Sequence, residues 1–170
     1  MKQSILYLIL FVLICSCTEV WFAEPQPPGT GSEKMFPGNL QGSYVDKNND
    51  TLVINDISFR YEDYKEGELS ENLILKKGGN YYFLNERRDS LWRLLVGEVK
   101  GNDLLLWAID GDNAVKIEML KKITNVKEVY STSDTGKIEG YIINPGKAEL
   151  ERMLSEGVFS EKARFNKIKF

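Results

Sequence analysis

The sequence predicts a mainly β fold, an antiparallel meander forming a small barrel or sandwich of about 8–10 strands with one C-terminal helix. From residue 40 onward, short β-type runs recur about every ten residues, and turn residues separate them. Connections of about two to six residues favour antiparallel neighbours, because a parallel pair needs a much longer crossover. The chain has 170 residues, of which 42% are hydrophobic and 28% charged, so it suits one folded domain.

The first 17 residues have the parts of an export signal. Residues 1–4 carry one lysine and no acid, and the apolar run over residues 5–14 has the length of a signal-peptide core. That run is too short to span a membrane, which takes about 20 apolar residues. The motif Ile14-Cys15-Ser16-Cys17 ends the segment, with an aliphatic residue at its start and a small residue directly before the last cysteine.

This motif resembles the lipobox of bacterial lipoproteins. The resemblance implies cleavage before Cys17, a diacylglycerol on the sulfur of Cys17 and an acylated amine, with palmitate as the typical acyl chain. Two or more chains anchor a protein stably, since each buried CH₂ contributes about 0.8 kcal/mol. The implied location is the bacterial cell envelope, where the lipid anchors the protein at the outer membrane. The periplasmic and the external face of that membrane are both possible locations.

Residues 17–39 are expected to be the lipidated cysteine and a flexible tether, between a signal peptide over 1–16 and a single β-rich domain over 40–170. Four of the chain's five prolines lie in this segment, which shows no period of 2 or 3.6. Fully extended, the tether would reach roughly 70–80 Å. Trp21 and Phe22 either rest among lipid headgroups or pack on the domain.

Eight strands are expected between residues 40 and 123, each bounded by turn residues. The eighth is assigned to residues 114–123 because Val115, Ile117 and Met119 alternate with polar residues, as in a half-buried strand. In chain order the expected strands cover residues 40–46, 51–54, 57–64, 72–77, 81–85, 90–100, 104–109 and 114–123.

Three of these runs, 72–77, 81–85 and 91–96, are apolar at consecutive positions, so both faces of the strand are apolar. Either both faces of the sheet are covered by other elements, or one face lines a cavity. No segment between these strands is long enough for a crossover helix, so a parallel sheet is not expected.

One helix is expected over residues 145–156. Asn144 suits the N-cap and Pro145 the first helical position, while Leu150, Met153 and Leu154 form one apolar stripe. Flanking strands are expected over residues 136–144 and 163–170, and the helix is expected to cap the sheet or plug one end of a barrel.

Composition excludes several classes of function. The chain has no histidine, so catalytic mechanisms of the Ser-His-Asp and Cys-His types are excluded. Its net charge of −3 argues against nucleic acid as a partner. Asp46, Asn48 and Asp50 have the spacing that opens an EF-hand loop, but Thr51 and Ile57 replace the required glycine and glutamate. We therefore expect a polar hairpin turn there, and no metal, cofactor or catalytic residue in the chain.

Aromatic residues gather in the central strands, and Tyr82, Trp92 and Trp107 are the candidate ligand-binding residues. Ordinary core packing is the alternative, because aromatic side chains favour strands and bury well. Gly42-Ser43-Tyr44 is similar to the Gly-x-Trp that opens lipocalin barrels, and a late helix before the last strand is similar too. This resemblance implies an antiparallel barrel with a cavity for a small apolar ligand.

Three functions stay open from the sequence. The first hypothesis is a non-enzymatic binding or interaction module, anchored to the membrane through Cys17. The alternatives are a lipocalin-like carrier of a small apolar ligand and an inhibitor or immunity-type protein. A cavity of about 300 Å³ or more permits a carrier, whereas a filled core favours a protein partner.

Overall fold

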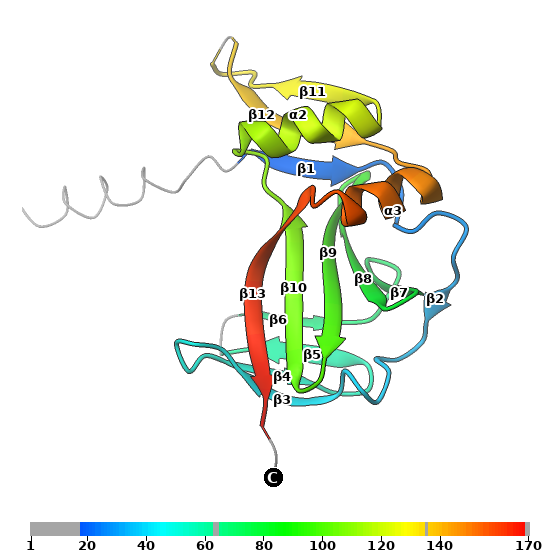
Figure 1. Ribbon diagram of the computed structural model, residues 1–170, viewed down its shortest axis with the longest axis vertical. Helices are drawn as coiled ribbons and strands as arrows, with labels where there is room; N and C mark the ends of the chain where they lie inside the picture. The colour runs from blue at the N-terminus through cyan, green and yellow to red at the C-terminus, as the bar shows by residue number, and fades with distance from the viewer. Residues whose placement is uncertain (1–17, 63–64, 135, 169–170) are drawn as a thin grey trace, which may run out of the picture.

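The computed structural model describes residues 18–168 apart from 63–64 and 135, so the predicted signal peptide and Cys17 lie outside the described residues. It confirms the mainly β fold class. The described residues form one 13-stranded, largely antiparallel sheet that curls into a half-barrel, together with two helices (Figure 1). No described helix is both long enough and apolar enough to cross a bilayer.

The strands outnumber those expected, because short pieces in segments expected to be tether or turn also pair. The main path of the sheet runs β11-β12-β1-β9-β10-β13-β3-β4-β5-β6, while β8 also pairs with β9, β7 with β8 and β2 with β7. Their bounds are β1 (Glu19–Phe22), β2 (Ser32–Glu33), β3 (Gly42–Val45), β4 (Thr51–Ile54), β5 (Ser58–Tyr61), β6 (Lys65–Glu68), β7 (Leu73–Gly78), β8 (Tyr81–Arg88), β9 (Leu91–Lys100), β10 (Asp103–Ile109), β11 (Val126–Tyr130), β12 (Ile138–Ile143) and β13 (Phe159–Lys167).

The central strands are apolar on both faces because each face has a different neighbour. One face packs on a buried group that we call the helix-side cluster, whose members include Phe22, Phe83, Trp92, Leu94, Val96, Leu120, Ile143, Leu150 and Met153. The other face carries the pocket-side cluster of Phe36, Leu40, Tyr44, Leu52, Ile54, Leu75, Tyr82, Leu104 and Phe165. Alternation along each strand assigns successive side chains to the two clusters.

The C-terminal helix is confirmed as α3 (Lys147–Ser155), which begins two residues later than expected. Its N-cap is Gly146 rather than Asn144, and Glu149 Oε2 accepts the Gly146 N–H at 2.8 Å. Leu150 and Met153 are fully buried against the sheet, and β13 follows the helix as expected. Gly157 has a φ of 73°, the left-handed conformation that glycine adopts readily after a helix end.

The strand expected over residues 114–123 is wrong, because this segment forms helix α2 (Ala114–Ile123). Asn113 caps it by accepting the Lys116 N–H at 3.2 Å, and the preceding Asp-Gly-Asp turn positions that cap. Ile117, Leu120 and Ile123 are its buried residues, at the spacing of one helix face. The same segment also alternates apolar and polar residues, and only burial on the helix-side cluster decides between the two patterns.

The flexible tether expected over residues 17–39 is also wrong for its described part, which packs on the domain. β1 pairs in parallel with β12 and antiparallel with β9, and Phe22 is only 1% exposed. The parallel pair was not expected, because its two strands lie more than a hundred residues apart. Two further segments expected to be irregular, Lys65–Glu68 and Val126–Tyr130, are strands β6 and β11.

Two buried polar side chains hold the proline-rich segment in place. Asn85 accepts the Gln26 N–H at 2.7 Å and donates to the Gln26 carbonyl at 2.8 Å. Lys76 Nζ donates to the carbonyls of Pro25 and Pro27, each at 2.9 Å. Burial lowers the pKa of Lys76, and these carbonyls supply the acceptors that its ammonium group needs. Prolines that suggested a loose spacer therefore form a docked loop.

Candidate functional site: an apolar pocket in the half-barrel

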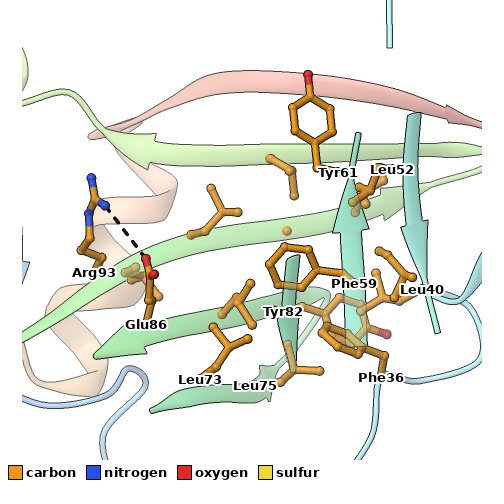
Figure 2. Close-up of a pocket in the computed structure, with 18 of the residues that line it drawn as sticks. Phe36, Leu40, Leu52, Phe59, Tyr61, Leu73, Leu75, Tyr82, Glu86 and Arg93 are labelled. Atoms are coloured by element: carbon orange, nitrogen blue, oxygen red, sulfur yellow. Dashed lines mark ion pairs between the residues drawn. The ribbon is translucent and has the colours of Figure 1, made fainter. Parts of the chain in front are cut away.

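The concave face of the half-barrel holds a pocket of about 660 Å³. Strands β4 to β6 form one wall, and the pocket face of β7 to β10 and β13 forms the other (Figure 2). Most of its lining is apolar, contributed by Leu40, Leu52, Phe59, Leu73, Leu75 and Tyr82 among others. A pocket of this size and lining suits a small apolar ligand.

Small residues on the long strands leave this space open. Gly97, Ala108 and Ala163 line the pocket where larger side chains would fill it. A Cβ added at Gly97 would lie 3.5 Å from Leu106 Cδ2, which is ordinary contact, so glycine is not required there by crowding. The pocket volume therefore depends on side-chain size at a few strand positions.

Gly67 on β6 has a different role. A Cβ at this position would lie 2.7 Å from the ring of Phe59, its cross-strand partner on β5. The absence of a side chain lets the Phe59 ring lie across β6 and face the pocket, where Phe36 meets it edge-on with ring centroids 6.5 Å apart. The glycine thus positions an aromatic wall residue.

The tyrosine hydroxyls of the pocket are engaged by the protein itself. Tyr82 donates to Asn39 Oδ1 at 3.0 Å, and Tyr61 donates to Asp50 Oδ2 at 3.0 Å. The Tyr61 ring also packs edge-on against Phe165, with centroids 5.7 Å apart. Both residues therefore supply ring surface to the pocket rather than a free polar group.

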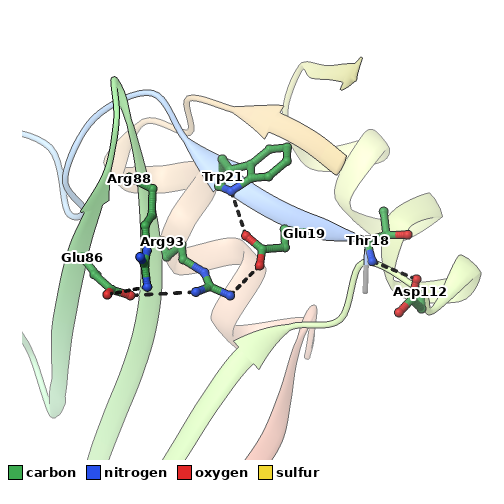
Figure 3. Close-up of polar contacts among 7 residues, drawn as sticks. All are labelled: Thr18, Glu19, Trp21, Glu86, Arg88, Arg93 and Asp112. Carbon is green, nitrogen blue, oxygen red and sulfur yellow. Dashed lines mark hydrogen bonds and ion pairs between the residues drawn. The ribbon is translucent and has the colours of Figure 1, made fainter. Parts of the chain in front are cut away.

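One end of the pocket is charged. Arg93 Nη1 lies 4.0 Å from Glu86 Oε2, and both residues line the pocket (Figure 2). Arg93 Nη2 is also paired with Glu19 Oε1 on β1 at 2.6 Å, while Glu86 is paired with Arg88 at 2.8 Å (Figure 3). These side chains are a third to a half exposed, so the pairs contribute little stability. They provide polar partners beside an otherwise apolar space.

The three candidate ligand-binding residues separate onto different faces. Tyr82 lines the pocket, whereas Trp92 and Trp107 pack with the helix-side cluster and do not line it, in agreement with the core-packing alternative. Register explains the separation: Tyr82 pairs with Gly97 on the pocket face, and Trp107 pairs with Val96 on the other. Trp92 stacks under the Arg87 guanidinium, 5.9 Å from its ring centroid.

Several pocket residues were not among the candidates. Phe36 was assigned to the tether, and Phe59, Leu73 and Leu75 were counted only as strand residues. The sequence carried a signal for Leu73 and Leu75, because the run over residues 72–77 is apolar on both faces of the strand. The small residues Gly97, Ala108 and Ala163 carried no signal in the sequence, since their effect depends on what lies opposite them.

The polar turn expected at residues 46–50 is confirmed between β3 and β4. Asp46 Oδ1 accepts the N–H groups of Asn48 and Asp50, at 2.7 and 2.9 Å. This carboxylate therefore closes the turn, as short acidic side chains commonly do. In the described part of the chain, no three or more Cys, Asp or Glu side chains gather in an arrangement that could hold a metal ion.

Comparison with known proteins finds no relative: no family model, no curated protein sequence and no solved structure matches the chain. The similarity to lipocalins therefore rests on a short motif and on the order of the last helix and strand. In the structure Tyr44 of that motif is 1% exposed, and its hydroxyl donates to the Leu40 carbonyl at 2.8 Å. It belongs to the pocket-side cluster.

Proposed function

We propose that this chain is a lipid-anchored envelope protein that binds a small, predominantly apolar molecule in the half-barrel pocket, without catalysing a reaction. The observation that carries the proposal is the pocket itself. Its volume of about 660 Å³ is well above the lower size of ligand sites, roughly 300 Å³. This space favours a carrier over an interaction module, for which a filled core was expected.

The lining defines the chemistry of the ligand. Apolar side chains, leucine and phenylalanine foremost, cover most of the pocket surface, and burying apolar ligand surface against them contributes about 25 cal/mol per Å². Glu86 and Arg93 stand at one end, where a polar group of the ligand can find both a donor and an acceptor. The expected ligand has an apolar body and a polar group at one end.

The mass of the mature protein, purified gently from its own host, tests this function. The native mass is expected to exceed the denatured mass by that of one small molecule, whereas covalent acylation contributes equally to both. Protein stripped of ligand is expected to bind the apolar fluorophore N-phenyl-1-naphthylamine saturably at one site. Equal masses together with no saturable uptake of the fluorophore would overturn the proposed function.

Replacement of Cys17 by alanine is expected to move the protein from the membrane fraction to the soluble fraction. The variant loses the only residue that the lipobox resemblance marks for acylation, and with it the anchoring by about 0.8 kcal/mol per buried CH₂. Fractionation and metabolic labelling with palmitate measure the change. Cys15→Ala is the matched control and is expected to stay acylated and membrane-bound. A Cys17→Ala protein that still takes up palmitate would show that the lipobox assignment is wrong.

A further inference from the structure

The first described residue is clamped to the domain. The Thr18 N–H donates to Asp112 Oδ1 at 3.1 Å, in the turn that precedes α2 (Figure 3). The Thr18 carbonyl lies so close to Gly111 that a Cβ there would overlap it. Hydrogen bonds from the side chain and backbone of Thr18 hold the pKa of Asp112 below its usual range. This clamp is therefore present at neutral pH and is lost only as the pH falls through that lowered pKa.

The clamp leaves no spacer between the predicted anchor and the domain. Cys17 is covalently joined to Thr18, and consecutive Cα atoms are about 3.8 Å apart. The next four residues form β1, which is paired on both sides. A lipid on Cys17 would thus hold the surface around Thr18 at the headgroups, instead of suspending the domain on a long tether.

Chain position and sheet register bring two exposed apolar side chains near this point. Val115, in the first turn of α2 and three residues beyond Asp112, is 68% exposed. Tyr130 is 52% exposed and pairs with Ile138 on β12. Ile138 lies two residues before Gly140, which pairs with Glu19 at the start of β1. The sheet register therefore brings the end of the β11–β12 hairpin next to the start of β1. An apolar ring with a polar tip, such as tyrosine, is favoured at a membrane–water interface.

We infer that the face formed by Thr18, Val115 and Tyr130 docks on the lipid bilayer, with Val115 and Tyr130 in the headgroup layer. The inference rests on the lipid anchor of the proposed function. It places the layer of β1, β11, β12 and α2 nearest the membrane and the curled strands β3–β6 at the other end of the molecule (Figure 1). The ligand pocket is then built largely on the part of the domain that is held away from the bilayer.

Lipid quenching of single labelled cysteines tests this orientation in the full acylated protein. Mature protein is expected to have no other free thiol, because cleavage before Cys17 removes Cys15 and the lipid occupies the sulfur of Cys17. Val115→Cys and Tyr130→Cys each carry a fluorophore on the proposed membrane face. The matched control is Asn102→Cys, an exposed position at the far end of β10 from the Asp112 turn, roughly 25 Å along the strand at about 3.3 Å per residue.

Vesicles of phosphatidylethanolamine and phosphatidylglycerol carry a nitroxide on the lipid headgroup. Labels at residues 115 and 130 are expected to lose emission on these vesicles, while a label at residue 102 keeps the emission it has on nitroxide-free vesicles. Equal quenching at the three positions, or quenching at 102 alone, would overturn the inference. Protein that does not float with vesicles would overturn it together with the anchor, whereas an empty pocket would appear only in the native mass and leave the quenching unchanged.

Discussion

Replacing Phe22 with alanine is expected to lower the free energy of unfolding by about 3–5 kcal/mol, the usual cost of deleting a buried aromatic ring. Phe22 is 1% exposed, and its strand neighbours Trp92 and Ile143 belong to the same helix-side cluster. The loss combines the transfer free energy of the ring with the cavity left behind. Urea unfolding of the chain from residue 18 onward measures it.

Met35→Ala is the matched control, because it removes a large side chain from the same N-terminal segment. Met35 is 55% exposed, so its loss is expected to change the free energy of unfolding by no more than about 0.5 kcal/mol. If both variants unfolded like the wild type, residues 18–39 would be a tether after all. The contrast between the two substitutions therefore separates a docked strand from a spacer.

Replacing Ala163 with phenylalanine is expected to weaken binding of the apolar ligand at least tenfold, or about 1.4 kcal/mol. Ala163 lines the pocket from β13 and packs beside the pocket-side cluster, so a ring at this position occupies the space that the ligand needs. Titration of ligand-free protein with N-phenyl-1-naphthylamine measures the affinity. Thermal unfolding checks that the variant stays folded, since filling a cavity adds apolar contacts instead of removing them.

Ala148→Phe is the control for this substitution. Ala148 is exposed on α3 and does not line the pocket, so the same change in side chain is expected to leave the affinity unchanged. A folded Ala163→Phe protein that bound the fluorophore as tightly as the wild type would place the binding site elsewhere. Equal weakening by both substitutions would show that the loss does not come from the pocket.

The hairpins could be predicted from the sequence because their causes are local. β4 and β5 are joined across Asn55, Asp56 and Ile57, and β8 and β9 across Asp89 and Ser90, close to the positions expected. Helix α3 and the strand that follows it were predicted for the same reason, since an apolar stripe and a terminal glycine lie within one short segment. Burial confirms that stripe at Leu150 and Met153.

Predictions failed where a distant partner decides the outcome. β1 is a strand because it pairs with the edges of β12 and β9. No residue near Glu19 in the sequence indicates those partners. α2 alternates like a strand, yet the helix-side cluster accepts Ile117, Leu120 and Ile123 from one helix face. In both cases tertiary packing outweighs a weak local preference.

The sequence was enough to predict the fold class, the places of most hairpin turns and the last helix, because turn residues and apolar periodicity act over a few neighbouring positions. It also carries the lipobox-like motif, which needs no fold to be recognised. Which face of the central strands lines a pocket and which is covered by helices depends on long-range packing, which the sequence pattern does not show. A strand alternates its side chains without specifying what lies on either side, and the curl of β3–β6 and the docking of β1 supply those neighbours from far along the chain.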